Sequence, residues 1–129
     1  MPRTIADLTE TERAFLSERH LATLTTMRPD GTPHVVAIAF SYDADDGLVR
    51  IISSDNTQKV RNTERHGRAA VCQVEGPRWL TLEGEARVVR DPDRIATAVS
   101  GFEVRYRPAR ENPDRVAIEI AVDRLMGRA

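Results

Sequence analysis

The stretch Leu21-Ala-Thr-Leu-Thr-Thr-Met-Arg-Pro-Asp-Gly-Thr-Pro-His-Val-Val36 predicts a β-hairpin and sets the expected fold class of the chain. Leu21 to Met27 is rich in threonine and aliphatic residues, which favour extended backbone. Arg28-Pro29-Asp30-Gly31 supplies the proline, aspartate and glycine of a tight turn. The run from Thr32 to Tyr42 is long and mostly apolar, so we expect one strand there, buried on both faces over part of its length.

Turn signals outside the hairpin divide the rest of the chain into further strands. Asp43-Ala44-Asp45-Asp46-Gly47 precedes an expected strand at 48–53, and Glu75-Gly76-Pro77 separates expected strands at 68–74 and 78–89. The last strand, at 116–122, has the clearest pattern, because β-branched residues alternate with other residues along it. The sequence therefore predicts six strands.

Helical signals are found before, between and after these strands. Thr9 and Glu12 match a capping box, a short helix is expected from about Thr57 to His66, and Asp91-Pro92 predicts the start of an amphipathic helix. The chain shows no regular alternation of strands and helices. We therefore expect a mainly β fold with inserted helices, an antiparallel β-barrel that occupies residues 1–129 as a single domain.

Composition excludes several classes of function. Nineteen basic and twenty acidic side chains give a formal net charge of −1, so no overall field attracts nucleic acid or an anionic membrane. No run approaches the ~20 apolar residues of a membrane span, and the N-terminus lacks the apolar core of a signal peptide. Cys72 is the only cysteine, which excludes a disulfide framework and fits the cytoplasm. The three histidines and this cysteine lack metal-ligand spacing, so we expect no metal site.

The segment from Ile51 to Asn62 contains the only lysine of the chain, Lys59. An apolar run that ends in hydroxyl and amide side chains, followed by a cation at the start of a helical pattern, is typical of a phosphate site. Exposed N–H groups and the helix dipole favour an anion there. A helix cap is the alternative, with Lys59 on a solvated face. The cap would then be Ser54, Asn56 or Thr57.

Three segments together resemble the split β-barrel flavin and deazaflavin oxidoreductases, the pyridoxamine-phosphate-oxidase-like superfamily. These are the hairpin stretch, the Ser53-Ser54…Lys59-x-x-Asn62 segment and Leu82-Glu-Gly-Glu-Ala-Arg-Val-Val-Arg-Asp91. The resemblance covers about residues 8 to 125, and shorter motifs extend it to the branch that uses the deazaflavin coenzyme F420. Those motifs are Ser17-Glu-Arg-His-Leu-Ala-x-Leu-Thr-Thr26, Gln58-Lys59, Cys72-Gln73-Val74, Arg78-Trp79-Leu80 and Arg105-Tyr106-Arg107.

This resemblance implies a homodimer of two barrels, with coenzyme F420 in the groove between them. The ring edge is expected to pair with the backbone of Pro33-His34-Val35-Val36. Trp79 and Tyr106, from the partner chain, would cover the ring or the substrate. Arg78 would lie near an anionic group, and we hypothesise that either bound water or Arg78 supports transfer of a proton to the product. The phosphodiester is expected to lie against Ser53, Ser54, Thr57, Gln58, Lys59 and Asn62.

Two of these residues have structural alternatives. Trp79 lies in an apolar stretch and also suits a core or interface position, and His34 at a strand start also suits a hydrogen-bonded structural role. No acid, base or nucleophile motif is evident, which is consistent with chemistry carried by a coenzyme.

The resemblance implies that a hydride passes from the reduced deazaflavin to a conjugated small-molecule acceptor, for which a biliverdin-like tetrapyrrole is the leading candidate. One alternative is an FMN-dependent oxidase or reductase of the same fold, because Lys59 and its hydroxyl neighbours also suit a phosphate monoester. The other is a non-catalytic binder of flavin, haem or tetrapyrrole.

Overall fold

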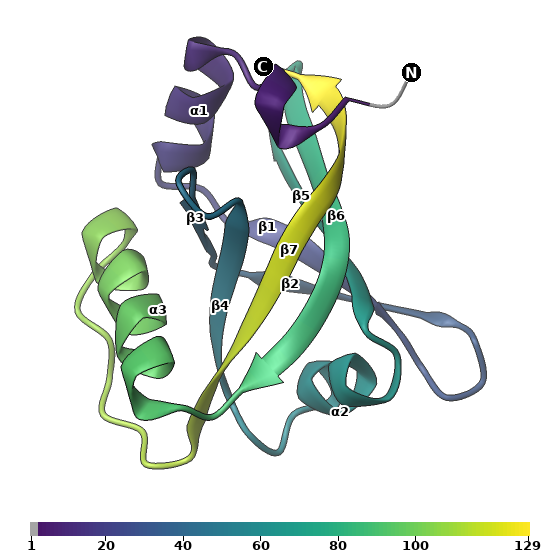
Figure 1. Cartoon of the computed structure of the whole chain (residues 1–129), viewed down its shortest axis with the longest axis vertical. Coiled ribbons are helices and arrows are strands. Elements are labelled where there is room, and N and C mark those ends of the chain that lie inside the picture. The colour runs from purple at the N-terminus through teal and green to yellow at the C-terminus, as the bar shows by residue number, and fades with distance from the viewer. Residues whose placement is uncertain (1–2) are drawn as a thin grey trace.

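Seven strands form one antiparallel sheet in the order β2-β1-β5-β6-β7-β4-β3 (Figure 1). The computed structural model describes residues 3–129, so the first two residues of the expected domain lie outside the described residues. The sheet is open, with β2 and β3 at its edges, and the expected mainly β split barrel is confirmed. The strands are β1 Ala22–Met27, β2 Pro33–Ile38, β3 Ser41–Asp43, β4 Leu48–Ser54, β5 Arg68–Glu75, β6 Arg78–Val89 and β7 Arg115–Arg128.

The helices lie around the sheet, with α1 and α2 at opposite ends and α3 beside β4 (Figure 1). The predicted capping box of α1 is present, because the Thr9 hydroxyl accepts from the Glu12 N–H at 3.0 Å and the Glu12 carboxylate accepts from the Thr9 N–H at 3.1 Å. Asp91 caps α3, and Pro92 is its first residue. The helical elements are η1 Ile5–Asp7, α1 Glu10–Ser17, α2 Gln58–Arg65 and α3 Pro92–Arg105.

The prediction of a single strand from Thr32 to Tyr42 is wrong. The chain forms β2, breaks at Phe40 and starts again as β3, which gives seven strands where six were predicted. The break is fixed from a distance, because Arg105 donates to the Phe40 carbonyl at 2.7 Å and the Tyr106 hydroxyl lies 3.2 Å from it. Double-sided burial is also wrong, since β2 pairs only with β1 and alternates between exposed and half-buried residues up to its last one.

The last strand is longer than predicted and continues to Arg128 because of a β-bulge. Glu83 pairs with Arg124 and Gly84 pairs with Val122, so one residue of β7, Asp123, is extra. A Cβ atom on Gly84 would lie 1.8 Å from the Ala121 carbonyl oxygen. Only glycine therefore allows the two backbones to approach at this point.

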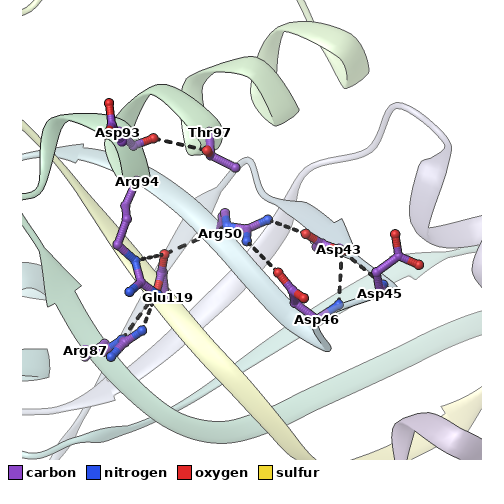
Figure 2. A network of polar contacts seen from close by, with 9 residues as sticks. All are labelled: Asp43, Asp45, Asp46, Arg50, Arg87, Asp93, Arg94, Thr97 and Glu119. Carbon is purple, nitrogen blue, oxygen red and sulfur yellow. Dashed lines mark hydrogen bonds and ion pairs between the residues drawn. The ribbon is translucent and has the colours of Figure 1, made fainter.

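A network of ion pairs attaches α3 to the sheet (Figure 2). Glu119 of β7, only 2% exposed, accepts from Arg87 of β6 at 3.0 Å and from the Arg94 Nε of α3 at 3.1 Å. Burial raises the pKa of Glu119, but the hydrogen bonds from Arg94 and Arg87 outweigh it and hold the pKa below its usual value. Arg50 lies 3.9 Å from Glu119 and pairs with Asp43 at 2.8 Å and with Asp46 at 3.6 Å. Three guanidinium groups thus meet three carboxylates.

Candidate functional site

Two strand edges remain unpaired where the barrel is split. β2 pairs with β1 alone, and β3 pairs with β4 only as far as Arg50, which leaves one edge of Ile51–Ser54 without a strand partner among residues 3–129. Backbone N–H and C=O groups on such edges are available to a ligand. The segment expected to face a coenzyme ring, Pro33 to Val36, lies on one of these edges. Pro33 and Val35 are exposed on β2, and His34 and Val36 are half-buried.

His34 is the most unusual member of this edge. Its Nδ1 atom is buried and has no hydrogen-bond partner in the part of the chain that the structure describes. Its neighbour across the ladder is Thr26 of β1, whose hydroxyl accepts from Asn62 Nδ2 at 3.1 Å. Buried polar atoms are normally paired, so this ring nitrogen is an exception among the described residues. His34, expected at the ring edge, and Asn62, expected at the phosphate, are therefore both neighbours of Thr26.

The start of α2 collects most of the expected phosphate-binding side chains. Ser53 Oγ lies 3.1 Å from Thr57 Oγ1, and Gln58 Nε2 donates to Asn62 Oδ1 at 2.7 Å. Thr57 occupies the cap position of α2, yet its side chain makes no capping hydrogen bond and instead donates to the Ser54 carbonyl at 3.2 Å. The simple helix-cap alternative therefore does not describe Thr57.

Lys59 of α2 is half-buried, and burial lowers the pKa of its ammonium group. It forms no ion pair with any residue that the structure describes. A partly desolvated cation without a counter-ion is unfavourable until an anion approaches it. Lys59 therefore has the electrostatic character of a binding residue.

A cavity of about 360 Å³ lies next to this cluster, between the end of β4, the end of α3 and the loop that precedes β7. We call it the arginine pocket. Arg115 donates to the Arg110 carbonyl at 2.6 Å, Asn112 donates to the Ser54 hydroxyl at 2.9 Å, and Arg107 lies 5.5 Å above the centre of the Phe102 ring. None of the lining residues among 3–129 is acidic. They are Ile52, Ser53, Ser54, Phe102, Arg107, Ala109, Arg110, Asn112 and Arg115.

Arg110 and Arg115 were not among the residues predicted for the site, and Arg107 was quoted only as part of a motif. Arg110 lies in a proline-containing loop and Arg115 begins a strand, and charged residues in such places are usually solvated. The sequence signal for this pocket was weak. It consists of three arginines within nine positions, and no motif nearby predicts that they share a site. Ser54, which was predicted, brings them into the site through its contact with Asn112.

Tyr106 follows α3 and lines a second cavity, which shares Phe102 and Arg107 with the arginine pocket. Its hydroxyl is half-buried, donates to the His20 carbonyl at 2.6 Å and lies 3.2 Å from the Phe40 carbonyl oxygen. Burial raises the pKa of this hydroxyl. Tyr106 therefore lies near the candidate site within the same chain, and it also links the segment before β1 to the segment between β2 and β3.

Arg78 and Trp79 lie at the other end of the long β6–β7 ladder. Trp79 pairs with Arg128, whereas the residue beside Ser53 on β7 is Val116, which is twelve positions earlier in the strand. Within one chain they therefore lie far from Ser53. Within its own chain Arg78 pairs with Glu18 at 2.9 Å and with Glu75 at 2.5 Å, and both pairs raise the pKa of its guanidinium.

The outward face of the sheet carries exposed apolar side chains. Trp79, for example, is 42% exposed, and its neighbours on adjacent strands point the same way. An uncovered apolar face of this kind is typical of a protein interface. The large apolar residues exposed on β2, β5, β6 and β7 are Val35, Val74, Trp79 and Met126.

Neither a metal centre nor a membrane segment is evident in the described structure. No group of three histidine, cysteine, aspartate or glutamate side chains among residues 3–129 is placed to hold a metal ion. No helix in the same range is both long enough and apolar enough to span a bilayer.

An open antiparallel barrel with unpaired strand edges beside a cationic, hydroxyl-lined pocket is the architecture of a split-barrel protein. The family model described as pyridoxamine 5'-phosphate oxidase matches residues 8–128. The chain therefore belongs to the pyridoxamine 5'-phosphate oxidase family.

The chain is also similar to individual members of this fold over most of its length. The chain is 46% identical over 129 residues to an F420H(2)-dependent biliverdin reductase of Mycobacterium tuberculosis, a match that covers all of this chain and 94% of that protein. A solved structure described as an F420 reductase is 27% identical with a TM-score of 0.76 and covers 92% of this chain and 98% of its own. HutZ, a haem storage protein of Vibrio cholerae, is 17% identical with a TM-score of 0.71 over 92% of this chain and 93% of its own, so it shares the fold alone.

Proposed function

We propose that this protein is a coenzyme F420-dependent reductase that acts on a conjugated acceptor, with a biliverdin-like tetrapyrrole as the substrate. The full-length similarity to an F420H(2)-dependent biliverdin reductase supports this function. The observation that carries it in the structure is the group of uncompensated cations beside the split edge of the barrel. Lys59 and the arginine pocket together offer positive charge with no acidic residue among the described lining residues.

The residues present fit such a coenzyme. A phosphodiester with an acidic tail requires several hydrogen-bond donors and more than one cation, and both are found between α2 and the loop before β7. The open backbone edge of β2, from Pro33 to Val36, would bind the ring edge. The phosphodiester and tail would be held by Ser53, Ser54, Thr57, Gln58, Lys59, Asn62, Arg107, Arg110 and Arg115.

The bound, reduced deazaflavin supplies the hydride, and the protein contributes binding, orientation and exclusion of water. The edge of β2 is held by Arg105 and Tyr106 through Phe40, so the surface that orients the ring is fixed by α3. Fixed placement of two reacting groups lowers a barrier without a titrating side chain. Tyr106 already donates its hydroxyl proton to the His20 carbonyl, so we assign it a positioning role.

We assign a binding role to Arg78 of the partner subunit. Its pKa is raised by Glu18 and Glu75, so the guanidinium retains its proton and supplies positive charge near an anionic group. The proton that completes the reduction would then come from water. Replacement of Arg78 by Gln should raise KM for the acceptor and leave the shape of the pH–rate profile unchanged. A changed pH profile would instead assign the proton transfer to Arg78.

The coenzyme site would be completed by a second copy of this chain, packed through the outward face that carries Val35, Val74, Trp79 and Met126. Each chain would then supply Trp79 and Arg78 to the site of the other. Val74 is 59% exposed in one chain, so Val74→Asp should fold normally and sediment as a monomer at concentrations where the wild type is a dimer. A wild-type monomer in sedimentation would rule out the shared site. A cytoplasmic location fits the single, unpaired Cys72.

A titration of coenzyme F420 against FMN tests the proposed cofactor. Binding is followed by deazaflavin and flavin fluorescence, and turnover by loss of biliverdin absorbance with reduced F420. We expect F420 to bind more tightly than FMN, because the arginine pocket extends the cationic surface beyond one phosphate. Tighter binding of FMN, or a protein purified with bound FMN, would favour the FMN-dependent alternative. Binding of F420 and biliverdin without turnover would favour a non-catalytic binder.

A further inference from the structure

A second cavity, of about 340 Å³, lies between three segments that are far apart in the sequence. The segment between α1 and β1 supplies Arg19, His20 and Leu21, the segment between β2 and β3 supplies Ala39, and the end of α3 supplies the rest. We call it the Leu21 pocket. It is lined by Arg19, His20, Leu21, Ala39, Phe102, Tyr106 and Arg107.

The lining of the Leu21 pocket combines apolar surface with two free cations. Leu21 is 64% exposed there, next to the rings of Phe102 and Tyr106, which lie 5.3 Å apart. Neither Arg19 nor Arg107 forms an ion pair with any residue in the range 3–129. An apolar surface flanked by unpaired guanidinium groups is complementary to an apolar molecule with carboxylates.

The carboxylate nearest to this pocket in the sequence is already engaged. Glu18 precedes Arg19, but its oxygens accept from Arg78 at 2.9 and 3.0 Å and from His20 at 2.9 Å. These contacts lower the pKa of Glu18 to about 2, so it remains charged and remains bound to Arg78. Arg19 is therefore left without this neighbour as a counter-ion.

The Leu21 pocket is also adjacent to the proposed coenzyme site. It shares Phe102 and Arg107 with the arginine pocket, and Ala39 directly follows β2, the strand expected to meet the coenzyme ring. A hydride acceptor must lie in contact with its donor. A molecule in the Leu21 pocket would lie beside the end of β2 and next to the arginine pocket.

We infer that the Leu21 pocket binds the acceptor, a conjugated apolar molecule whose carboxylate groups pair with Arg19 and Arg107. The conjugated body lies against Leu21, Phe102 and Tyr106, and the guanidinium groups hold the carboxylates. A tetrapyrrole with propionate side chains has this chemistry. The inference rests on the proposed function, since it gives the acceptor of that reaction a place in the fold.

The test compares biliverdin with its dimethyl ester, which keeps the conjugated body and lacks the carboxylates. Each is titrated into the protein without coenzyme, and binding is followed by the visible absorbance of the bilin. The wild type should bind the free acid at least about tenfold more tightly than the diester. Arg19→Gln should lose most of this preference. Arg13→Gln, which removes an exposed arginine of α1 that lines neither pocket, should keep it.

A second variant covers the case in which Arg19→Gln does not fold. Leu21 is exposed, so Leu21→Asp should fold, and its added negative charge should weaken binding of the free acid more than binding of the diester. In both variants the affinity for coenzyme F420, measured by deazaflavin fluorescence, should equal that of the wild type. Equal effects on the free acid and the diester would overturn the acceptor site.

The outcomes separate this inference from the function on which it rests. If the wild type reduces biliverdin with F420 and yet binds the free acid and the diester equally, the acceptor site is wrong and the function stands. If the wild type binds neither bilin nor F420, both are wrong. If only Arg107→Gln weakens the free acid, the carboxylate contact belongs to the arginine pocket and the Leu21 pocket is overturned.

Discussion

Two groups of three arginines lie on the same side of the sheet, and they differ in what compensates their charge. Arg50, Arg87 and Arg94 surround the buried Glu119, and two aspartates complete the balance (Figure 2). In the arginine pocket, by contrast, Arg107, Arg110 and Arg115 meet hydroxyl, amide and aromatic groups.

Strand β4 connects the two groups. Arg50 belongs to the first, and Ile52 and Ser54, two and four positions further along the same face, line the second. The presence of an arginine alone therefore does not reveal whether it stabilises the fold or binds a ligand. A guanidinium group that meets a carboxylate within the fold contributes to the attachment of α3, and one without such a partner is available to a ligand.

The largest effect should follow from removal of the carboxylate at the centre of the first group. Glu119→Gln leaves Arg87 and Arg94 without their partner, and because these arginines are partly exposed we expect a loss of about 2–3 kcal/mol in the free energy of unfolding. Urea unfolding measures this loss of stability. The matched control is Glu111→Gln on the exposed loop, for which we expect a change within about 0.5 kcal/mol. Equal stability of the two variants would show that the Glu119 ion pairs do not stabilise the fold.

Removal of two cations from the second group should affect binding and leave stability intact. Arg110→Gln combined with Arg115→Gln should weaken coenzyme F420 by about 100-fold, roughly tenfold for each charge-assisted contact. The free energy of unfolding should stay equal or rise slightly, since like charges are removed. Arg13→Gln, at an exposed arginine of α1 away from the pocket, is the control for binding. A loss of stability as large as that of Glu119→Gln would show that the pocket is structural.

Lys59 provides a test of intermediate size, because it is a single cation next to the pocket. Lys59→Ala should weaken coenzyme F420 by about tenfold in a fluorescence titration. Burial lowers the pKa of the ammonium, so its charge is lost at lower pH than in a free lysine. Affinity of the wild type should therefore fall as the pH rises from neutral toward 10.5, and the affinity of Lys59→Ala should change less. Equal affinity of the two proteins would remove Lys59 from the anion site.

The smallest effect concerns acid stability. The pKa of Glu119 is lower in the folded protein than its usual value of 4.5, so its contribution to stability is present above that pH and is lost as the pH falls through the folded pKa. The stability difference between the wild type and Glu119→Gln should therefore shrink in acid. Urea titrations at several pH values measure this difference. A stability difference that does not change with pH would mean that folding leaves the pKa of Glu119 unchanged.

The elements of this fold that depend on neighbouring residues in the sequence could be predicted. The Leu21–Val36 hairpin and the capping box of Thr9 and Glu12 are both present, and so is the cluster at the start of α2. In each case the residues that carry the signal also touch one another. Contacts between residues that are close in the sequence could therefore be predicted from it.

Features that depend on distant residues could not be predicted. The break at Phe40 is fixed by Arg105 and Tyr106, which lie more than sixty positions away, and nothing in the local apolar pattern marks it. The arginine pocket likewise forms where Ser54 meets Asn112. Periodicity records which face of an element is apolar, and it does not record which other element lies against that face.

The extra residue in β7 has a further consequence for the surface of the molecule. Side chains alternate along a strand, so one inserted position reverses the parity of every position after it. Up to Val122 the even-numbered residues point inward, and beyond the bulge Leu125 is buried while Met126 is exposed. In a regular ladder without the bulge, the even-numbered Met126 would point into the core and Leu125 would point outward. The bulge thus decides which of these two neighbouring apolar side chains is exposed on the face that carries Trp79.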